Sequence, residues 1–278
     1  MKAKVIVWSV VAVLVVLLLA VLLAFPSVFP LSFGTSYRYS NADRYQAGGA
    51  EIRDEVSELK IDWVSGSVRF LPHGEQTVRL EESSSSELTE KEKLHWYYEN
   101  GKLTVREYAS GRFSFRMPQK DLTVFYPAGA ELKELEIRNV SGSVRLEKGA
   151  DVLKVETVSG DIRFSSLPVR ELDIETVSGN VTGELESLSR LDFESVSGDL
   201  SLALGGAPEK IETETVSGDV SLRFAEGIGF SLEFESASGK FDCAVAFDSA
   251  GKNRYRSLDG SPAVSIEAES VSGDFRIG

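Results

Sequence analysis

Hydrophobic and polar residues alternate along most of the chain, and the alternation changes phase at regular points. Around Gly160, Leu153 and Val155 are apolar while their neighbours are polar, a period of two that is typical of a half-buried strand. Beyond Gly160 the apolar positions fall on even numbers, as at Ile162 and Phe164. A slip of one residue turns a flat strand to its other face unless the chain bends there. The Val-Ser-Gly tripeptide at the slip therefore predicts a corner, where glycine supplies backbone freedom or room for close approach.

The corner tripeptide belongs to a sequence repeat. Hexapeptides such as TVSGDI, TVSGNV, SVSGDL and TVSGDV make up seven copies, and a further copy, WVSGSV, lies 76 residues upstream of the first. The glycines of the seven copies are separated by 18, 19, 19, 20, 21 and 34 residues. The eight corner glycines are Gly66, Gly142, Gly160, Gly179, Gly198, Gly218, Gly239 and Gly273. Self-similarity at a nearly fixed period indicates units that stack on one another.

Two strands and two bends within 18–21 residues leave no room for a crossover helix, because a βαβ unit needs about 30 residues. The repeat therefore predicts an all-β fold, a right-handed parallel β-solenoid with two short strands per coil. The inward position before each corner is small and polar, and it is occupied by Asn139, Thr157, Thr176, Ser195, Thr215, Ser236 and Ser270. We expect these side chains to hydrogen-bond along the stack. The alternative, a row of nucleophiles, is disfavoured.

Together with the hydrophobic segment near the N-terminus, the repeat divides the chain into four expected parts. They are a cytoplasmic stub with a transmembrane anchor (1–26), a tether (27–58), an irregular β cap region (59–134) and the solenoid repeats (135–278).

Within the cap region, Asn100-Gly101 between alternating segments predicts a hairpin, and residues 122–126 predict a further strand. The last repeat is lengthened by an insertion within residues 247–262, and the chain stops at Gly278 directly after a strand. We therefore expect the last repeat to form the far end of the stack, with a partly bare strand edge.

The hydrophobic segment near the N-terminus runs from Val5 to Phe25, and Ser9 is the one clearly polar residue among its 21. A membrane-spanning helix needs about 20 apolar residues. Lys2 and Lys4 precede the segment, so the positive-inside rule predicts a single-pass anchor with a cytoplasmic N-terminus and an extracytoplasmic C-terminal domain. A cleaved signal peptide is the alternative, disfavoured by the length of the apolar core.

Composition narrows the functional classes. The net charge of −13 argues against nucleic acid as a partner, because phosphate binding needs a basic surface. The lone cysteine, Cys243, forms no intrachain disulfide. It falls on the same alternating positions as Phe241 and Val245, which predicts that it is a small, buried hydrophobic side chain. The two histidines, His73 and His95, lack the neighbours of a zinc site or a Ser/His/Asp triad. We therefore expect no catalytic, cofactor-binding or metal site.

Acidic residues occupy two outward positions in successive units. One set is Glu156, Glu175, Glu194, Glu214, Glu235 and Glu269, and the other is Asp173, Asp192, Glu212, Glu233 and Glu267. In a solenoid these sets form rows with neighbours about 4.8 Å apart, and we expect a solvated face. Weak binding of calcium or magnesium is an alternative. A carboxylate-based polysaccharide-cleaving site is another, although such a site should break the regularity of the repeat.

The terminal insertion holds the one basic and aromatic patch of this acidic chain, centred on Arg254, Tyr255 and Arg256. Tyrosine and arginine are favoured anchors at interfaces, so these residues are candidates for partner contact. A solvated loop is the simpler interpretation.

The repeat motifs TVSGDI, TVSGNV, SVSGDL and TVSGDV closely resemble those of a bacterial β-strand-repeat family labelled "putative adhesin", domain of unknown function 4097. The segments WVSGSV, DLTVFYPAGAELKELEIRNVSGSV and YRSLDGSPAVSIEAESVSGDF extend the resemblance over residues 50–278. It implies a parallel β-solenoid at the cell surface, behind a membrane helix, similar to accessory proteins of cell-envelope stress systems in Gram-positive bacteria. No catalytic residues come with it.

Two functional hypotheses follow. The first is a surface-displayed, adhesin-like interaction module that binds a protein or an envelope glycan. The second is an accessory regulator of envelope stress signalling that acts through another membrane protein. End-to-end polymerisation through the far edge of the stack is a third, weaker possibility.

Overall fold

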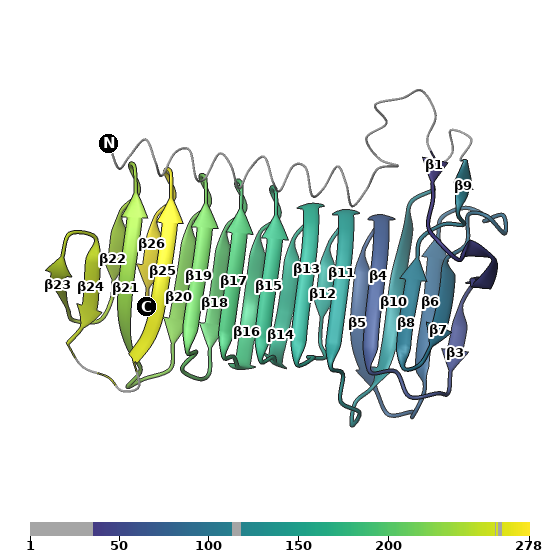
Figure 1. Cartoon of the computed structure of the whole chain (residues 1–278), viewed down its shortest axis with the longest axis horizontal. Helices are drawn as coiled ribbons and strands as arrows, with labels where there is room; N and C mark the ends of the chain where they lie inside the picture. Colours follow the sequence, from purple (N-terminus) through teal and green to yellow (C-terminus); the bar gives the residue numbers. More distant parts are fainter. Residues whose placement is uncertain (1–35, 113–117, 259, 261–262) are drawn as a thin grey trace.

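A computed structural model describes residues 36–112, 118–258, 260 and 263–278. This part of the chain is an all-β stack of two large sheets, with one short 3-10 helix, η1 (Ala42–Arg44) (Figure 1). The membrane helix predicted at residues 5–25 lies outside the described residues. In the ranges that are described, no helix is long and apolar enough to cross a membrane.

The larger sheet has 13 strands, and its central strands are parallel. In spatial order they are β2 (Gln46–Ala47), β7 (His95–Glu99), β8 (Lys102–Arg106), β4 (Glu58–Ser65), β11 (Glu134–Ser141), β13 (Val152–Ser159), β15 (Glu171–Thr176), β17 (Arg190–Ser195), β19 (Lys210–Thr215), β25 (Ala263–Ser270), β21 (Gly229–Ser236), β24 (Arg254–Ser257) and β23 (Phe247–Gly251).

The second sheet has 11 strands. In spatial order, starting from the end of the stack where the larger sheet ends in β23, they are β22 (Phe241–Cys243), β26 (Phe275–Ile277), β20 (Val220–Phe224), β18 (Leu200–Leu204), β16 (Val181–Ser187), β14 (Ile162–Pro168), β12 (Val144–Leu146), β5 (Val68–His73), β10 (Lys120–Pro127), β6 (Val78–Ser84) and β3 (Ala50–Ile52). A separate pair joins β1 (Ser36–Tyr37) to β9 (Gly111–Arg112). We call the end with β2 and β3 proximal and the end with β22 and β23 distal.

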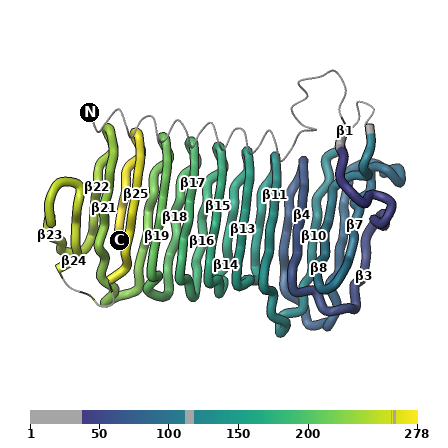
Figure 2. Tube along the Cα trace, in the orientation of Figure 1, coloured from purple at the N-terminus to yellow at the C-terminus, as the bar shows by residue number. Residues whose placement is uncertain are grey.

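Each repeat contributes one strand to each sheet, as the path of the chain in Figure 2 shows. Equivalent residues pair across coils: Leu153 is in register with Leu172, and Thr157 with Thr176. The burial of β13 alternates residue by residue as its sequence predicts. The predicted stack of parallel strands is therefore confirmed.

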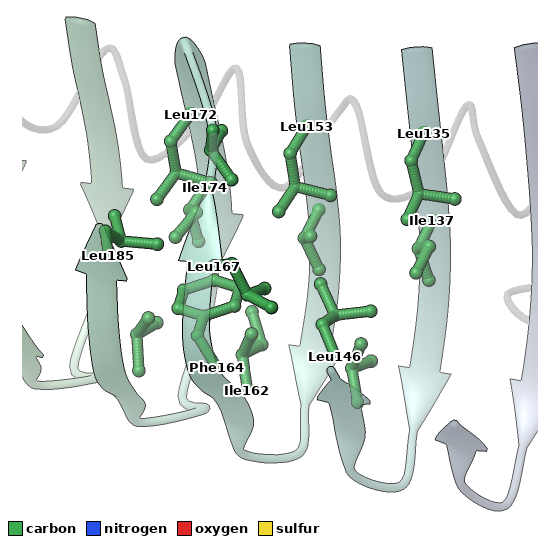
Figure 3. Packing of buried hydrophobic residues seen from close by; sticks show 14 of the residues in the cluster. Leu135, Ile137, Leu146, Leu153, Ile162, Phe164, Leu167, Leu172, Ile174 and Leu185 are labelled. Carbon is green, nitrogen blue, oxygen red and sulfur yellow. The ribbon is translucent and has the colours of Figure 1, made fainter. Parts of the chain in front are cut away.

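The core is a single apolar layer between the two sheets. In Figure 3, Leu153 and Leu172 from the larger sheet point toward Ile162, Phe164 and their neighbours from the other. These side chains are buried, and each contributes roughly 1.5–3 kcal/mol by leaving water. Since every coil shares its core with the next, the stack is stable where a single coil is not.

The regular coils begin upstream of Gly142. Strands β4 and β5 pair in register with β11 and β12 and form a complete coil. Strands β8 and β10 add another on its proximal side. The predicted hairpin is confirmed in β7 and β8, where Asn100 and Gly101 both have positive φ. The predicted strand at residues 122–126 is confirmed within β10.

The last two coils are exchanged in space relative to the sequence. Strand β25 lies between β19 and β21, and β26 lies between β20 and β22. The prediction that the final repeat forms the far end of the stack is therefore wrong. The hairpin β23–β24, formed by the terminal insertion, extends the larger sheet beyond β21, so that sheet does not end in a solenoid strand. The second sheet does end in one, because β22 has β26 as its one neighbour among the described strands, so the expected partly bare edge is confirmed there. Because β25 carries the same motif as every other repeat, it fits the interior position as well as the end.

Candidate functional site

The eight corner glycines stack directly on one another. A Cβ at any of them would lie 1.9–2.2 Å from a backbone oxygen of the adjacent coil, in most cases the oxygen of the preceding corner glycine. Only Gly66, Gly142 and Gly160 lie in the left-handed region, with φ of +100°, +120° and +146°. All eight corners therefore require glycine for the same reason: the backbones of adjacent coils approach so closely there that no side chain fits.

The serine and the aspartate of the motif connect neighbouring coils. The Ser197 hydroxyl donates to the carbonyl of Val177 at 3.2 Å, and the same bond recurs from coil to coil. The Asp199 carboxylate accepts a hydrogen bond from the backbone N–H of Asp219 at 2.8 Å, and Asn180 accepts one from Asp199 at 3.0 Å. The serine, the glycine and the aspartate of the motif therefore each have a structural task at the corner.

The inward polar row differs from the predicted ladder. Thr176, Ser195, Ser236 and Ser270 each accept a hydrogen bond from the glycine N–H three residues later in their own corner. Only the bond from Thr215 to Ser270, at 3.2 Å, joins two members of the row. The prediction that these side chains hydrogen-bond to one another along the stack is therefore wrong for most of the row. The nearest backbone N–H without another partner belongs to the same corner, and the side chain accepts from it instead.

The outer face of the 13-stranded sheet carries both acidic rows in register. The first runs in space through Glu156, Glu175, Glu194, Glu214, Glu269 and Glu235. The second runs through Asp173, Asp192, Glu212, Glu267 and Glu233. Toward the proximal end the signs alternate instead, as in the ion pair of Arg138 with Glu156 at 3.1 Å. We call the continuous part the acidic face.

The centre of the acidic face is electrostatically strained. Burial, reinforced by the neighbouring carboxylates of Glu156 and Asp173, raises the pKa of Glu175 to about 7. Burial and the flanking Glu175 and Glu214 raise the pKa of Glu194 to about 7 as well. These carboxylates are half-buried rather than freely solvated. Like charges on adjacent strands destabilise a sheet, so this face costs folding energy when it is fully ionised.

The candidate contact residues of the terminal insertion lie on β24 at the distal end. Arg254 and Arg256 are exposed, and Arg254 pairs with Glu233 at 3.2 Å. Tyr255 points the other way, with its ring centroid 4.6 Å from that of Phe241. The strand therefore separates the aromatic residue from the two basic ones, and the three do not form one patch.

A buried ionic cluster at the proximal corner was missed by the sequence analysis. Lys120 is 1% exposed and its Nζ lies 2.7 Å from Glu82 and over the ring of Tyr108 at 4.3 Å. Glu107 accepts hydrogen bonds from the backbone N–H groups of Val64 and Ser65. Burial raises the pKa of Glu107 to about 6, against the opposing effect of Lys120.

One signal points to this cluster. Asp121 accepts a hydrogen bond from Ser67 at 2.7 Å, as the motif aspartates do, and Lys120 stands where the corner glycine belongs. Lys120 and Asp121 are thus a degenerate corner of the coil formed by β8 and β10. No further coil covers that corner within the described chain, so a long side chain fits there and closes the end of the core.

The remaining polar candidates bond to the backbone. His73 contacts the carbonyl of Thr77 at 2.7 Å, and His95 that of Lys93 at 2.9 Å. Across the described ranges, no group of three His, Cys, Asp or Glu side chains could hold a metal ion. Cys243 is half-buried, which corrects the predicted full burial. The reason is that β22 ends its sheet and has a neighbouring strand on one side only.

Stacked parallel coils, joined at corners by a repeated Val-Ser-Gly motif, define a solenoid-like class of β protein. The family model described as Toastrack DUF4097 matches residues 87–278, and the chain belongs to this family. Among curated proteins, no sequence matches it.

Solved structures of related shape include a protein described as a "putative adhesin" from Bacteroides fragilis, 14% identical, with a TM-score of 0.49 and coverage of 83% of this chain and 97% of that one. A "putative cell adhesion protein" from Clostridium sporogenes is 14% identical, with a TM-score of 0.38 and coverage of 84% and 99%. A "putative lipid binding protein" from Parabacteroides distasonis is 14% identical, with a TM-score of 0.42 and coverage of 84% and 97%.

Proposed function

We propose that this protein is a membrane-anchored, extracytoplasmic interaction module, adhesin-like and non-catalytic. Its N-terminal hydrophobic segment would hold the β stack outside the membrane, with the N-terminus in the cytoplasm. The observation that carries the proposal is the acidic face: register-matched carboxylates repeat from coil to coil on one side of the stack. A repeating array of identical groups suits an extended partner, a protein or an envelope glycan, better than it suits a small substrate.

The shape of the molecule supports this assignment. The described chain enters at the proximal end, where β1 pairs with β9, and the distal end lies at the other extreme of the stack (Figure 1). An anchor that precedes residue 36 would therefore attach near one end and leave the other free. The corner motif, which is the most repetitive part of the sequence, is occupied by hydrogen bonds between coils. This leaves the sheet faces and the distal tip for binding.

The proposal is tested by photocrosslinking in intact cells. A photoreactive amino acid replaces Glu194 on the acidic face, and Ser201 on the outer face of β18 serves as the matched position. We expect Glu194 to capture an extracytoplasmic protein or a wall glycan, and external protease to digest the stack without cell lysis. Protection from protease in intact cells would contradict the location. Capture of only a membrane kinase or regulator would favour a role in envelope stress signalling instead.

A further inference from the structure

The distal tip concentrates the exposed apolar surface of the described chain. The large hydrophobic side chains that remain exposed there are Val245, Phe247 and Leu258, at 45%, 38% and 56% exposure. All three lie between β22 and β25, in or beside the hairpin that ends the larger sheet. No large apolar residue in the described proximal part is exposed to this degree. Apolar side chains that gather at one end of an otherwise charged molecule mark an interaction site.

Both sheets also end at this tip with a free strand edge. Among the described strands, β23 pairs only with β24, and β22 pairs only with β26. The ring of Phe247 lies 5.2 Å from Phe241 and 5.9 Å from Tyr255, so the exposed ring extends an aromatic cluster that closes the core. A free edge beside an apolar cluster is a template for another strand.

We infer that the distal tip binds the distal tip of a second copy of this chain, with β23 antiparallel to its counterpart across a two-fold axis near Ser249. This inference rests on the proposed function and names one partner for it. In that register Asp248, the one charged residue of β23, faces Ala250 of the second copy and not its own equivalent. The tip can thus pair with itself without opposing like charges.

The charge of the rest of the molecule favours this contact over side-by-side association. The net charge is −13, and the acidic face repeats carboxylates along several strands. Two such faces repel each other, whereas β23 contributes one carboxylate per copy. A bulge between Ser249 and Gly251 bends the strand, which keeps the pairing short. The apolar side chains of the tip therefore supply most of the contact.

A contact between like ends closes after two molecules. An interface that uses the same patch on both partners gives a two-fold dimer, while a head-to-tail contact gives an open fibre. The two stacks then point in opposite directions, with their proximal ends farthest apart. Anchored as proposed, the two copies would sit in opposing membranes, so the contact joins surfaces and does not pair neighbours within one membrane.

Disulfide trapping of the full chain in detergent micelles tests the inference. The variant Ser249→Cys, in a Cys243→Ser background, places a thiol on the expected axis, where facing residues of antiparallel strands are close enough to be bridged. We expect a covalent dimer after mild oxidation. Ser201→Cys in the same background, exposed in the middle of the stack, is the matched control and should stay monomeric. Equal trapping of both variants, or of neither, would overturn the inference.

Sedimentation of the untrapped protein gives an independent measurement. Leu258→Lys should lower the dimer fraction at least tenfold with an unchanged melting temperature. Phe247→Lys should lower the dimer fraction as much but with some loss of stability, because the Phe247 ring packs against Phe241 and Tyr255. Ser201→Lys should leave both quantities unchanged. A monomer at every concentration for the unaltered chain would also overturn the inference. If tip variants stay monomeric while Glu194 still captures an envelope partner in cells, the inference fails and the proposed function stands. If dimers form but no extracytoplasmic exposure is found, the proposed function fails and the pairing of the distal tips stands.

Discussion

Asp199 accepts a hydrogen bond from the backbone N–H of Asp219 in the next coil, at a distance of 2.8 Å. The aspartate of the repeated motif therefore acts on the neighbouring coil and not on its own.

We predict that Asp199→Ala lowers the free energy of unfolding by about 1 kcal/mol, the usual net value of one intramolecular hydrogen bond. Asp199→Asn should leave stability nearly unchanged, because Asn180 already serves as the acceptor at the equivalent position. Urea denaturation of the two variants measures the difference. Equal loss in both would mean that the charge, and not the acceptor, matters.

Gly198→Ala should be far more damaging. The added methyl would lie 2.1 Å from the carbonyl oxygen of Gly179, so adjacent coils must separate locally. We expect a loss of about 3 kcal/mol, at the upper end of ordinary overpacking, measured by thermal or urea unfolding. Gly74→Ala is the control, since nothing in the described chain lies within 4 Å of a methyl group added there; a similar loss in that variant would undermine the explanation.

Two threonines of the inward row should respond differently to the same substitution. Thr176 accepts a bond from the Gly179 N–H at 2.9 Å, so Thr176→Val should cost about 1 kcal/mol or more. The buried hydroxyl of Thr157 finds no hydrogen-bond partner within the described part of the chain. Thr157→Val should therefore be neutral or stabilising. Unfolding of both variants by urea compares them directly, and an equal cost would show that Thr157 is satisfied in solution.

The acidic face predicts a pH dependence of stability. The pKa of Glu175 and of Glu194 is raised to about 7 in the folded state by burial and neighbouring carboxylates. The folded protein then binds more protons than the unfolded chain between about pH 4.5 and pH 7. The stabilising contribution of these groups is complete below the lower value and is lost as the pH rises through 7. Melting temperature should thus be higher at pH 5.5 than at pH 8.

Glutamine variants separate this effect from net charge. Glu175→Gln and Glu194→Gln should reduce the rise in melting temperature on acidification and should stabilise the protein at pH 8. Glu184→Gln removes the same charge from an exposed site on β16 and should change the pH profile little. A profile that shifts equally in all three variants would point to overall charge as the cause.

The stacking and register were predictable because the repeat displays them directly: residues 152–157 of β13 each pair with the residue of β15 at the same motif position. The exchange of the last two coils was not predictable, because β25 has the same motif as the other repeats and pairs in register with both β19 and β21. The buried Lys120 was hidden for a different reason. Its corner has lost the glycine, and only Asp121 retains the motif.

The candidate interaction surface was predictable in part. The acidic rows follow from the period of the repeat, but their half-burial and raised pKa depend on side-chain packing that no single repeat displays. Arg254 and Tyr255 lie on the predicted insertion, yet adjacent residues of a strand point to opposite faces. The apolar tip around Phe247 could not be predicted, because the sequence does not show which strand ends the sheet.

The most direct test of the stack is a set of cysteine pairs in a Cys243→Ser background. Glu269 is in register with Glu214 on one side and with Glu235 on the other. Under mild oxidation, the pairs Glu214→Cys with Glu269→Cys and Glu269→Cys with Glu235→Cys should each form an intramolecular disulfide, measured by mass spectrometry of the monomer. Glu214→Cys with Glu235→Cys should not, because a whole coil lies between them. A disulfide between positions 214 and 235, with none between 214 and 269, would contradict the order in which β25 lies between β19 and β21.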